Sequence, residues 1–370
     1  MKALITLFII LGLTGCGGEA DLVTYNVGLA RGFVSYADER VEPVSQAVAG
    51  LEADALCIQE AWLREDEEGN WNTDYIDAIK SASSERFPHV YWERTKNEGA
   101  ATSCTLEEAA ELQTCAETYC PDVSPGELAD CALEYCGDLF NASSAGCQSC
   151  IAANIGNSIE VILDRCVGGS GSAAYDGHNG LMLMSQTEPL ETHHVQFTSA
   201  LTTRSALHAQ IKLPGLGKTD LFCTHLAADL SGILTYPGTE FGSFVEEQKY
   251  QIEALLEFVD QHSSTGQAII MGDFNTGPDD IEENYQLLGD AGFSNPYVEA
   301  NGDALCTYCG ENSLNGGTGG VTIDHVMPRF PISASQSSRL FDETVSITAE
   351  EGELSSHLSD HYGVRLIIEQ

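Results

Sequence analysis

An acid and an amide follow an apolar run in the segment AIIMGDFNTGP, residues 268–278. Asp273 and Asn275 are two residues apart, so on an extended chain their side chains point to the same side. Polar side chains at the end of a buried strand are costly unless they serve a site. The alternative is that both residues cap the turn before Pro278. The pair therefore suggests a functional site and does not by itself establish one.

Polar residues of similar types lie at the ends of other apolar runs. Buried polar groups are costly unless they are paired or serve a site, and α/β sheets bind ligands at strand ends. Each such residue alone could be a turn or cap residue, but their recurrence at equivalent positions predicts one shared site. These residues are Asn26, Glu60, His225, Asp324, Asp360 and His361.

Short apolar runs alternating with helical patterns should position these side chains. Helices are predicted over residues 41–51 and 245–261, where apolar residues recur at helical spacing. Several of the apolar runs are apolar enough to be strands covered on both faces. The predicted strands are residues 21–27, 54–60, 180–185, 208–213, 220–226, 268–273, 322–327 and 364–368.

The chain has 370 residues, of which 43% are apolar, so it can bury a large core. We predict one α/β domain over residues 21–370, interrupted by an insertion at residues 104–166. Cysteine spacing marks the insertion, because eight of the 13 Cys lie there and TCAETYC, DCALEYC and GCQSC form a short repeat. Such a density predicts helical turns joined by disulfides in an oxidising compartment. Zinc is the alternative for the CxxC at residues 147–150.

Four more cysteines lie outside the insertion. Cys57 and Cys223 fall inside predicted strands and are interpreted as small buried hydrophobic residues. Cys306 and Cys309 have CxxC spacing and could form a disulfide or bind zinc.

The N-terminal segment MKALITLFIILGLTGC has the features of an export signal. It carries one Lys and an apolar run over residues 3–13 that is too short to span a bilayer. Its end resembles a bacterial lipobox, which implies removal of residues 1–15 as a signal peptide and lipid attachment to Cys16, with residues 16–20 as anchor and linker. A plain secretory signal is the alternative. We expect an exported protein anchored to a bacterial membrane, at the outer membrane or cell surface.

The charge is strongly acidic, with 16 basic and 56 acidic residues and a formal net charge of −40. Such a surface repels polyanions, whereas nucleic-acid-binding proteins usually carry a basic footprint. A nucleic-acid partner is thus disfavoured without being excluded. We expect a monomer.

Seven segments in this order resemble the endonuclease/exonuclease/phosphatase superfamily, namely TYNV, CIQE, HNGLMLMS, THL, GDFN, TIDHV and a late SDH. That superfamily contains deoxyribonuclease-type nucleases, bacterial sphingomyelinases and inositol-phosphate phosphatases. The resemblance covers residues 21–368 apart from the insertion. It implies a four-layer α/β/β/α sandwich, in which two sheets pack face to face with helices outside.

The resemblance implies a metal-dependent phosphodiester hydrolase. Glu60 would be the principal ligand of Mg²⁺, with Asn26 beside it and Asp360 completing the shell; other divalent cations could serve. Magnesium prefers oxygen ligands and needs only one or two carboxylates. Asp273 would position or deprotonate the attacking water, and Asn275 would hold that water or a phosphate oxygen.

The same resemblance assigns roles to the remaining residues. His361 would contact the scissile phosphate as a general acid/base or electrostatic stabiliser, and Asp324 would fix its tautomer and favour its charged form. His225 and Asn179 would donate hydrogen bonds to phosphate oxygens.

Three functions stay open at this point. A sphingomyelinase or phospholipase C-like enzyme, or one acting on another small phosphodiester, leads because the charge favours zwitterionic or small substrates. A DNase-like endonuclease and a catalytically inactive surface binding module are the alternatives. Tyr236, Phe241 and Phe244 either rim the site or belong to the core. The sequence lacks the long hydrophobic hairpin with which secreted sphingomyelinases bind membranes.

Overall fold

The computed structural model describes residues 18–65, 70–96, 104–121, 123, 128–168, 178–238, 240–302, 305–349 and 352–369. Cys16 and the predicted signal peptide lie outside the described residues. Within the described parts of the chain, no helix is long and apolar enough to cross a membrane.

The first sheet has six strands in the order β12-β15-β1-β2-β6-β5. Its central pair, β1 and β2, is parallel, and every other neighbouring pair is antiparallel. The strands are β1 (Glu19–Leu29), β2 (Ala55–Ala61), β5 (His89–Tyr91), β6 (Met182–Ser185), β12 (Ala334–Leu340) and β15 (Gly363–Glu369).

The second sheet has five strands in the order β11-β10-β9-β8-β7. Here β9 and β10 form the parallel pair, flanked by antiparallel neighbours. The strands are β7 (Glu191–Phe197), β8 (Arg204–Leu213), β9 (Gly217–His225), β10 (Ala268–Asp273) and β11 (Asp324–Pro328).

The two sheets pack face to face and bury side chains from both sides. Leu22 of β1 lies in the core between the sheets with Leu221 of β9. The next residue, Val23, points to the opposite face and packs under helices with Val44. Because alternate residues of a strand point to opposite faces, a continuous apolar run is what a strand covered on both sides requires.

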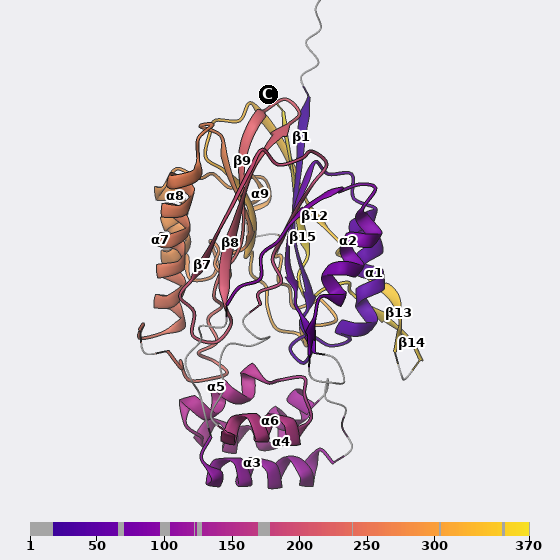
Figure 1. The fold of residues 1–370 in the computed structure, drawn as a ribbon, viewed down its shortest axis with the longest axis vertical. Coiled ribbons are helices and arrows are strands. Elements are labelled where there is room, and N and C mark those ends of the chain that lie inside the picture. Colours follow the sequence, from indigo (N-terminus) through magenta and orange to yellow (C-terminus); the bar gives the residue numbers. More distant parts are fainter. Residues whose placement is uncertain are drawn as a thin grey trace, which may run out of the picture.

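Helices cover the outer faces of both sheets (Figure 1). α1 (Ala37–Ala49) and α2 (Asp74–Ser83) lie on the first sheet, and α7 (Phe244–His262) and α8 (Glu282–Asp290) on the second. The predicted four-layer α/β/β/α sandwich is therefore confirmed.

Smaller elements complete the sandwich. Neither β7 nor β12 was predicted, because their sequences, ETHHVQF and ASQSSRL, are polar and largely exposed edge strands. A short helix, α9 (Pro296–Asn301), and two two-stranded sheets are the remaining small elements. One sheet pairs β3 (Arg64–Glu65) with β4 (Trp71–Asn72), and the other pairs β13 (Val345–Ala349) with β14 (Gly352–Ser356).

The insertion forms a separate layer of four helices at one end of the sandwich (Figure 1). They are α3 (Leu106–Tyr119), α4 (Leu128–Ala142), α5 (Ala145–Ala153) and α6 (Ile159–Gly168). Thr105 starts α3 with a capping box, because its side chain accepts from the Glu108 amide while Glu108 accepts from the Thr105 amide. Four disulfides join the helices: Cys104–Cys147, Cys115–Cys136, Cys120–Cys131 and Cys150–Cys166. The mostly helical, disulfide-rich character of the insertion is confirmed.

Cys57 and Cys223 are buried inside strands as predicted, but their interpretation as unpaired residues was wrong. They form a disulfide that joins β2 to β9, and so links the two sheets through the core. The sequence could not show this pairing, because it depends on how the sheets face each other. Disulfides of this number indicate an oxidising compartment.

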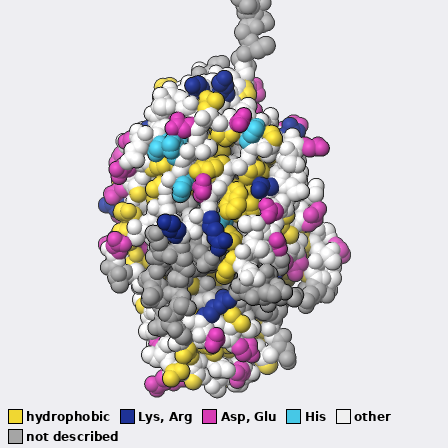
Figure 2. Space-filling model, viewed as in Figure 1, with side chains coloured by type: hydrophobic (Ala, Val, Ile, Leu, Met, Phe, Trp, Pro, Cys, Tyr) yellow, Lys and Arg dark blue, Asp and Glu magenta, His cyan; other side chains and the backbone are white. Residues whose placement is uncertain are grey.

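The acidic residues are dispersed over the surface. Figure 2 shows Asp and Glu side chains scattered over the visible face, with fewer Lys and Arg among them. This distribution agrees with a solvated acidic surface.

Candidate active site

The predicted polar residues converge at the end of the sandwich that faces the insertion. Asn26 and Glu60 lie near the ends of the parallel strands β1 and β2, and His225 and Asp273 end the parallel strands β9 and β10. Their strands come from different sheets, and face-to-face packing brings Glu60, His225 and Asp273 to one pocket of about 220 Å³. Its polar lining residues are Glu60, Thr202, Arg204, His225, Asp273, Asn275, Tyr308, Asp360 and His361. Asn26 does not line this pocket but is hydrogen-bonded to Glu60 and Asp273.

Asp273 and Asn275 both line this pocket, but the extended-chain reason given for their pairing was wrong. Asn275 has φ of 49°, so the chain turns sharply after β10. The turn is held by the amide of Asn275, which donates to Asp273 Oδ1 at 2.9 Å. The Asn275 side chain also donates to the carbonyl of Leu226 at 3.0 Å. A left-handed residue at this point is a local strain of the kind that persists at functional sites.

Asn26 connects the carboxylates of the two sheets. Its side-chain nitrogen donates to Glu60 Oε1 at 3.1 Å and to Asp273 Oδ2 at 2.8 Å. Its oxygen accepts from the amide of Gly28 at 3.0 Å. In this arrangement Asn26 offers a donor to the carboxylates, and its amide would have to rotate to offer its oxygen to a metal.

Glu60 and Asp360 are brought into the pocket by unusual backbone. Glu60 has φ of 61°, and Gly28, with φ of 53°, leaves room for Asp360. A Cβ at Gly28 would lie 2.3 Å from Asp360 Oδ1, so only glycine permits this approach. Burial and the charge of Asp360 raise the pKa of Glu60.

The donor set of the pocket suits a divalent cation. Three carboxylates, those of Glu60, Asp273 and Asp360, line the pocket, and ligand atoms of Glu60, His225 and Asp273 lie within 4.8 Å of one another. The carboxylate of Asp324 is paired with His361. Oxygen-rich sites of this kind are what magnesium prefers. A cation would also lower the cost of holding several negative charges in a buried space.

His225 is held in one tautomer by a residue that the sequence reading missed. The guanidinium of Arg204 donates from Nη1 to His225 Nδ1 at 2.8 Å, and an arginine cannot accept a hydrogen bond. The proton of a neutral His225 must therefore be on Nε2. Burial and the charge of Arg204 lower the pKa of His225 well below its usual value, which keeps the ring neutral.

The Nε2–H of His225 faces the pocket. It lies 3.4 Å from Asp273 Oδ2 and 3.8 Å from Glu60 Oε1. The side-chain nitrogen of Asn275 lies 3.2 Å from the same atom. In this tautomer both nitrogens carry hydrogen and cannot bond each other, so the space beside them suits an anionic oxygen that accepts from both.

His361 is paired with Asp324. His361 Nδ1 lies 2.9 Å from Asp324 Oδ2, and its Nε2 lies 3.8 Å from Asp273 Oδ2. Burial alone would lower the pKa of His361, but the charges of Asp324, Asp273 and Asp360 raise it well above its usual value. The surrounding carboxylates therefore favour the charged form of the ring, which directs its Nε2–H into the pocket. Burial and the charge of Asp324 raise the pKa of Asp273 to about 7.

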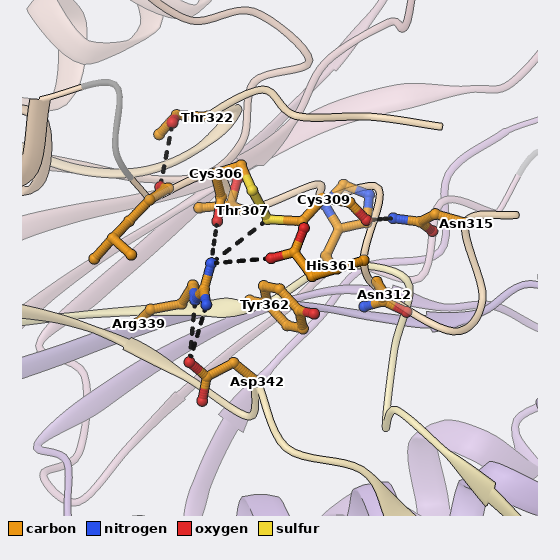
Figure 3. The surroundings of a disulfide bond; sticks show 12 residues. Cys306, Thr307, Cys309, Asn312, Asn315, Thr322, Arg339, Asp342, His361 and Tyr362 are labelled. Carbon is orange, nitrogen blue, oxygen red and sulfur yellow. Dashed lines mark hydrogen bonds and ion pairs between the residues drawn. A yellow bond between two sulfur atoms is a disulfide. The ribbon is translucent and has the colours of Figure 1, made fainter. Parts of the chain in front are cut away.

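A short disulfide loop supports this pair (Figure 3). Cys306 and Cys309 form a disulfide, so zinc is not needed to explain their spacing. Between them, Thr307 Oγ1 accepts from the amide of Asp324 at 3.1 Å, and the Thr307 carbonyl accepts from the amide of Tyr362 at 2.8 Å. The loop therefore fixes the backbone on both sides of the His361–Asp324 contact.

The outer side of the disulfide loop is held by Arg339. Its guanidinium donates to the Cys306 carbonyl at 3.2 Å and to Asp342 Oδ2 at 3.1 Å (Figure 3). It also lies over the ring of Tyr362, 4.6 Å from the centroid. Tyr308 then lies against His361, with ring centroids 5.1 Å apart.

Arg40 is a second buried arginine that the sequence reading missed. It is fully buried and donates to the carbonyls of Val27, Gly28 and Leu358, at 3.3, 2.5 and 2.8 Å. These bonds tie the end of β1 to the segment that precedes Asp360. A basic residue on a helix gave no sequence signal for this role.

Asn179 does not line the pocket. It is fully buried, and its side chain donates to Ser205 Oγ on β8. Its oxygen has no partner among the described residues. Its predicted contact with phosphate stays a prediction that requires a movement of this side chain.

The aromatic residues after THL do not line the pocket either. Phe244 is buried at the start of α7, and Tyr236 packs against it and donates to Glu247 at 2.9 Å. Phe241 packs on Tyr250, with centroids 5.0 Å apart. Of the two interpretations, packing is the one observed for these rings.

A separate histidine cluster lies on the outer face of the second sheet. His193, His208 and His262 present nitrogens within 4.8 Å of one another, near the C-terminal end of α7. None of the three lines the pocket that holds His225 and His361.

Comparison with known proteins agrees with this geometry. The sequence profile of the Endonuclease/Exonuclease/phosphatase family matches residues 23–361. No curated protein matches by sequence.

Three solved structures illustrate the shared fold. Sphingomyelinase C from Streptomyces griseocarneus aligns with a TM-score of 0.55 at 14% identity and covers 95% of this chain and 99% of its own. A mutant beta toxin from Staphylococcus aureus, solved with bound magnesium ions, aligns with a TM-score of 0.57 at 11% identity. It covers 95% of this chain and 100% of its own. Truncated TDP2 from Caenorhabditis elegans aligns with a TM-score of 0.53 at 13% identity. It covers 95% of this chain and 98% of its own.

The resemblance inferred from the strand-end residues is thus confirmed by an independent profile and by the fold. Because the profile spans most of its length, this chain belongs to the endonuclease/exonuclease/phosphatase family, whose members hydrolyse phosphoester bonds.

Proposed function

We propose that the protein is a divalent-metal-dependent phosphodiester hydrolase. The observation that carries this proposal is the pairing of His361 with Asp324, with His361 beside Asp273 and Glu60 in one pocket. A phosphodiester needs an activated water, neutralisation of its non-bridging oxygens and a stabilised leaving oxygen. The pocket offers a separate group for each need.

The pocket residues can be assigned to successive steps of phosphodiester hydrolysis. Asp273 accepts a proton from the attacking water, because burial raises its pKa to about 7 and makes it a stronger base than an exposed carboxylate. His225 Nε2–H and the amide of Asn275 hold a non-bridging oxygen. His361 donates its proton to the leaving oxygen, and Asp324 stabilises the charged ring beforehand.

Glu60 and Asp360 would hold the metal. A bound magnesium ion would offset the developing charge on the phosphate oxygens. Asn26 would either orient the two carboxylates, as its present hydrogen bonds do, or rotate its amide and join the ligands.

The substrate that suits the molecule is a small or zwitterionic phosphodiester, as in a sphingomyelinase or phospholipase C-like reaction. The net charge of −40 opposes the approach of a polynucleotide, so a DNase-like activity is the weaker candidate.

We place the protein outside the cytoplasm, attached through a lipid on Cys16. The six disulfides support export. Figure 1 shows the start of β1 at the end of the sandwich away from the insertion. Asn26 lies further along β1, hydrogen-bonded to Asp273 of the pocket. A membrane close to Glu19 would leave the pocket facing away from it.

The test is product release by the chain from residue 17 onward, with magnesium or with a chelator. Sphingomyelin vesicles and plasmid DNA are assayed in parallel, and Asp273→Asn is compared with the exposed control Asp290→Asn. Phosphocholine release that is lost with the chelator and with Asp273→Asn alone supports the proposal. DNA nicking with the same dependence supports the endonuclease, and no turnover of any phosphodiester supports the inactive binding module.

A further inference from the structure

An apolar cavity of about 250 Å³ lies between the insertion and the sandwich. The insertion contributes side chains from all four helices, including Leu112, Leu128, Ile151 and Ile162. The sandwich closes it with two loops, at residues 32–33 and 230–234. Among the described residues that line it, not one carries a polar or charged side chain.

This cavity adjoins the catalytic pocket. Phe33 and Leu230 line both spaces, one from each loop. The near wall of the catalytic pocket is also apolar, with Ala30, Val34 and Leu201. The carboxylates and imidazoles described above are therefore adjacent to an apolar surface that suits a hydrocarbon chain.

The mouth of the cavity is exposed. Phe33, Leu133 and Ile233 are 43%, 48% and 52% exposed, which is unusual for large apolar side chains. Contiguous exposed apolar groups of this kind mark sites of interaction with apolar partners. An engineered apolar cavity of about 150 Å³ binds benzene, so this larger one has room for a short alkyl chain.

The walls are fixed in place. Four disulfides hold the helices, and Gln148 of α5 accepts from the amide of Thr235 at 2.8 Å. A Cβ at Gly32 would lie 2.4 Å from the nitrogen of Gly156, so the loop and the insertion are in close contact. The cavity is thus a built feature and not a gap between loosely joined parts.

We propose that this cavity binds a hydrocarbon chain of the substrate while its phosphate occupies the catalytic pocket. The substrate is then an amphiphilic phosphodiester, and the insertion supplies its chain-binding subsite. The inference rests on the proposed phosphodiesterase function and deepens it. A polar occupant would lose its hydrogen bonds to water there without replacement, which is costly.

The first experiment uses alkyl p-nitrophenyl phosphates with methyl, butyl, hexyl and octyl groups, all below their micellar concentrations. These are phosphodiesters of one chemistry that differ only in chain length. We expect kcat/KM to rise by up to about fourfold for each added CH₂ until the cavity is full, because a buried CH₂ contributes about 0.8 kcal/mol.

The matched variants are Ala132→Phe and Ala110→Phe. Ala132 is half-buried on α4 and lines the cavity, whereas Ala110 is exposed on α3 and does not. Ala132→Phe should flatten the chain-length dependence and leave hydrolysis of the methyl ester unchanged, and Ala110→Phe should change neither. If Ala132→Phe does not fold, Ile233→Asp places a charge at the exposed mouth and should have the same effect.

A binding measurement separates the two proposals. Calorimetry compares hexylphosphocholine with phosphocholine on the Asp273→Asn protein and on the same protein with Ala132→Phe. Turnover of all four esters with no chain-length dependence overturns the subsite and leaves the phosphodiesterase standing. Absence of turnover, with hexyl-dependent binding that Ala132→Phe removes, overturns the phosphodiesterase and keeps the subsite. If the protein shows neither turnover of the esters nor binding of hexylphosphocholine, both proposals are overturned.

Discussion

At the scale of single residues, Arg204 decides which nitrogen of His225 carries the proton. Replacing Arg204 with Met removes the donor to Nδ1, so the neutral ring can place its proton there and lose its N–H toward the phosphate. We expect kcat to fall by about a hundredfold to a thousandfold, the range for one lost donor at an oxyanion. The ¹⁵N shifts of His225 should report the changed tautomer. Arg86→Met, on the surface beside Glu52, should change neither the shifts nor kcat.

The titration of His178 should make the free energy of unfolding depend on pH. It is buried, and its Nδ1 accepts from the amide of Gly180 at 2.9 Å. Burial and the charge of Arg94 lower its pKa to about 3. The unfolded chain therefore binds a proton that the folded chain does not, between about pH 6.5 and 3. The free energy of unfolding should fall with decreasing pH in this window, by up to about 1.4 kcal/mol per pH unit from this residue.

The measurement is denaturant unfolding at a series of pH values. His178→Asn keeps an acceptor for Gly180 and cannot titrate, so its slope should be shallower than that of the parent protein. Exposed His194→Asn is the control. An identical slope for His178→Asn and the parent would show that His178 does not contribute.

At the scale of elements, the Cys306–Cys309 loop positions β11. Thr307 Oγ1 accepts from the amides of Ile323 and Asp324 at 3.0 and 3.1 Å, and Thr307 is fully buried. Thr307→Val keeps the shape but leaves two buried N–H groups without partners. We expect a loss of about 1–3 kcal/mol for each unpaired group in the free energy of unfolding, measured with denaturant. We also expect a lower kcat, because Asp324 is no longer fixed beside His361.

Thr322→Val is the matched control for this loop. Thr322 is also buried, and its side chain donates to the carbonyl of Leu305. It should lower the free energy of unfolding and leave kcat unchanged. Equal kcat values for the two variants would contradict the positioning role of Thr307.

At the scale of the whole molecule, the formal charge of −40 should govern which substrates reach the pocket. Repulsion of an anionic phosphodiester is weakened by salt, whereas a zwitterionic substrate feels little of it. Raising NaCl from about 10 to 150 mM shortens the screening length from about 30 to 8 Å. We expect kcat/KM for an anionic ester to increase over this range and that for a phosphocholine ester to stay nearly constant. A decrease for the anionic ester would show that local positive groups such as Arg204 dominate its approach.

The sequence by itself determined the family, the strands that are covered on both faces and most of the polar residues in the pocket. These features are local, since a strand appears as a run of apolar residues and a motif as a few adjacent letters. The apolar runs beside the GDFN and SDH motifs were enough to predict that Asp273 and His361 lie at strand ends. No contact between the two residues had to be known. Asp273 ends β10, which is parallel to β9, and His361 precedes β15, which is antiparallel to β1, so both residues lie at the same end of the sandwich.

The tertiary structure alone decided the features that join distant segments. Cys57 and Cys223 are 166 residues apart and pair only because the two sheets face each other. Arg204 begins a strand that no catalytic motif marked, and it reaches His225 because β8 is antiparallel to β9. The apolar cavity exists only where the insertion meets the loops at residues 32–33 and 230–234. Such contacts depend on packing between elements, which periodicity within an element does not encode.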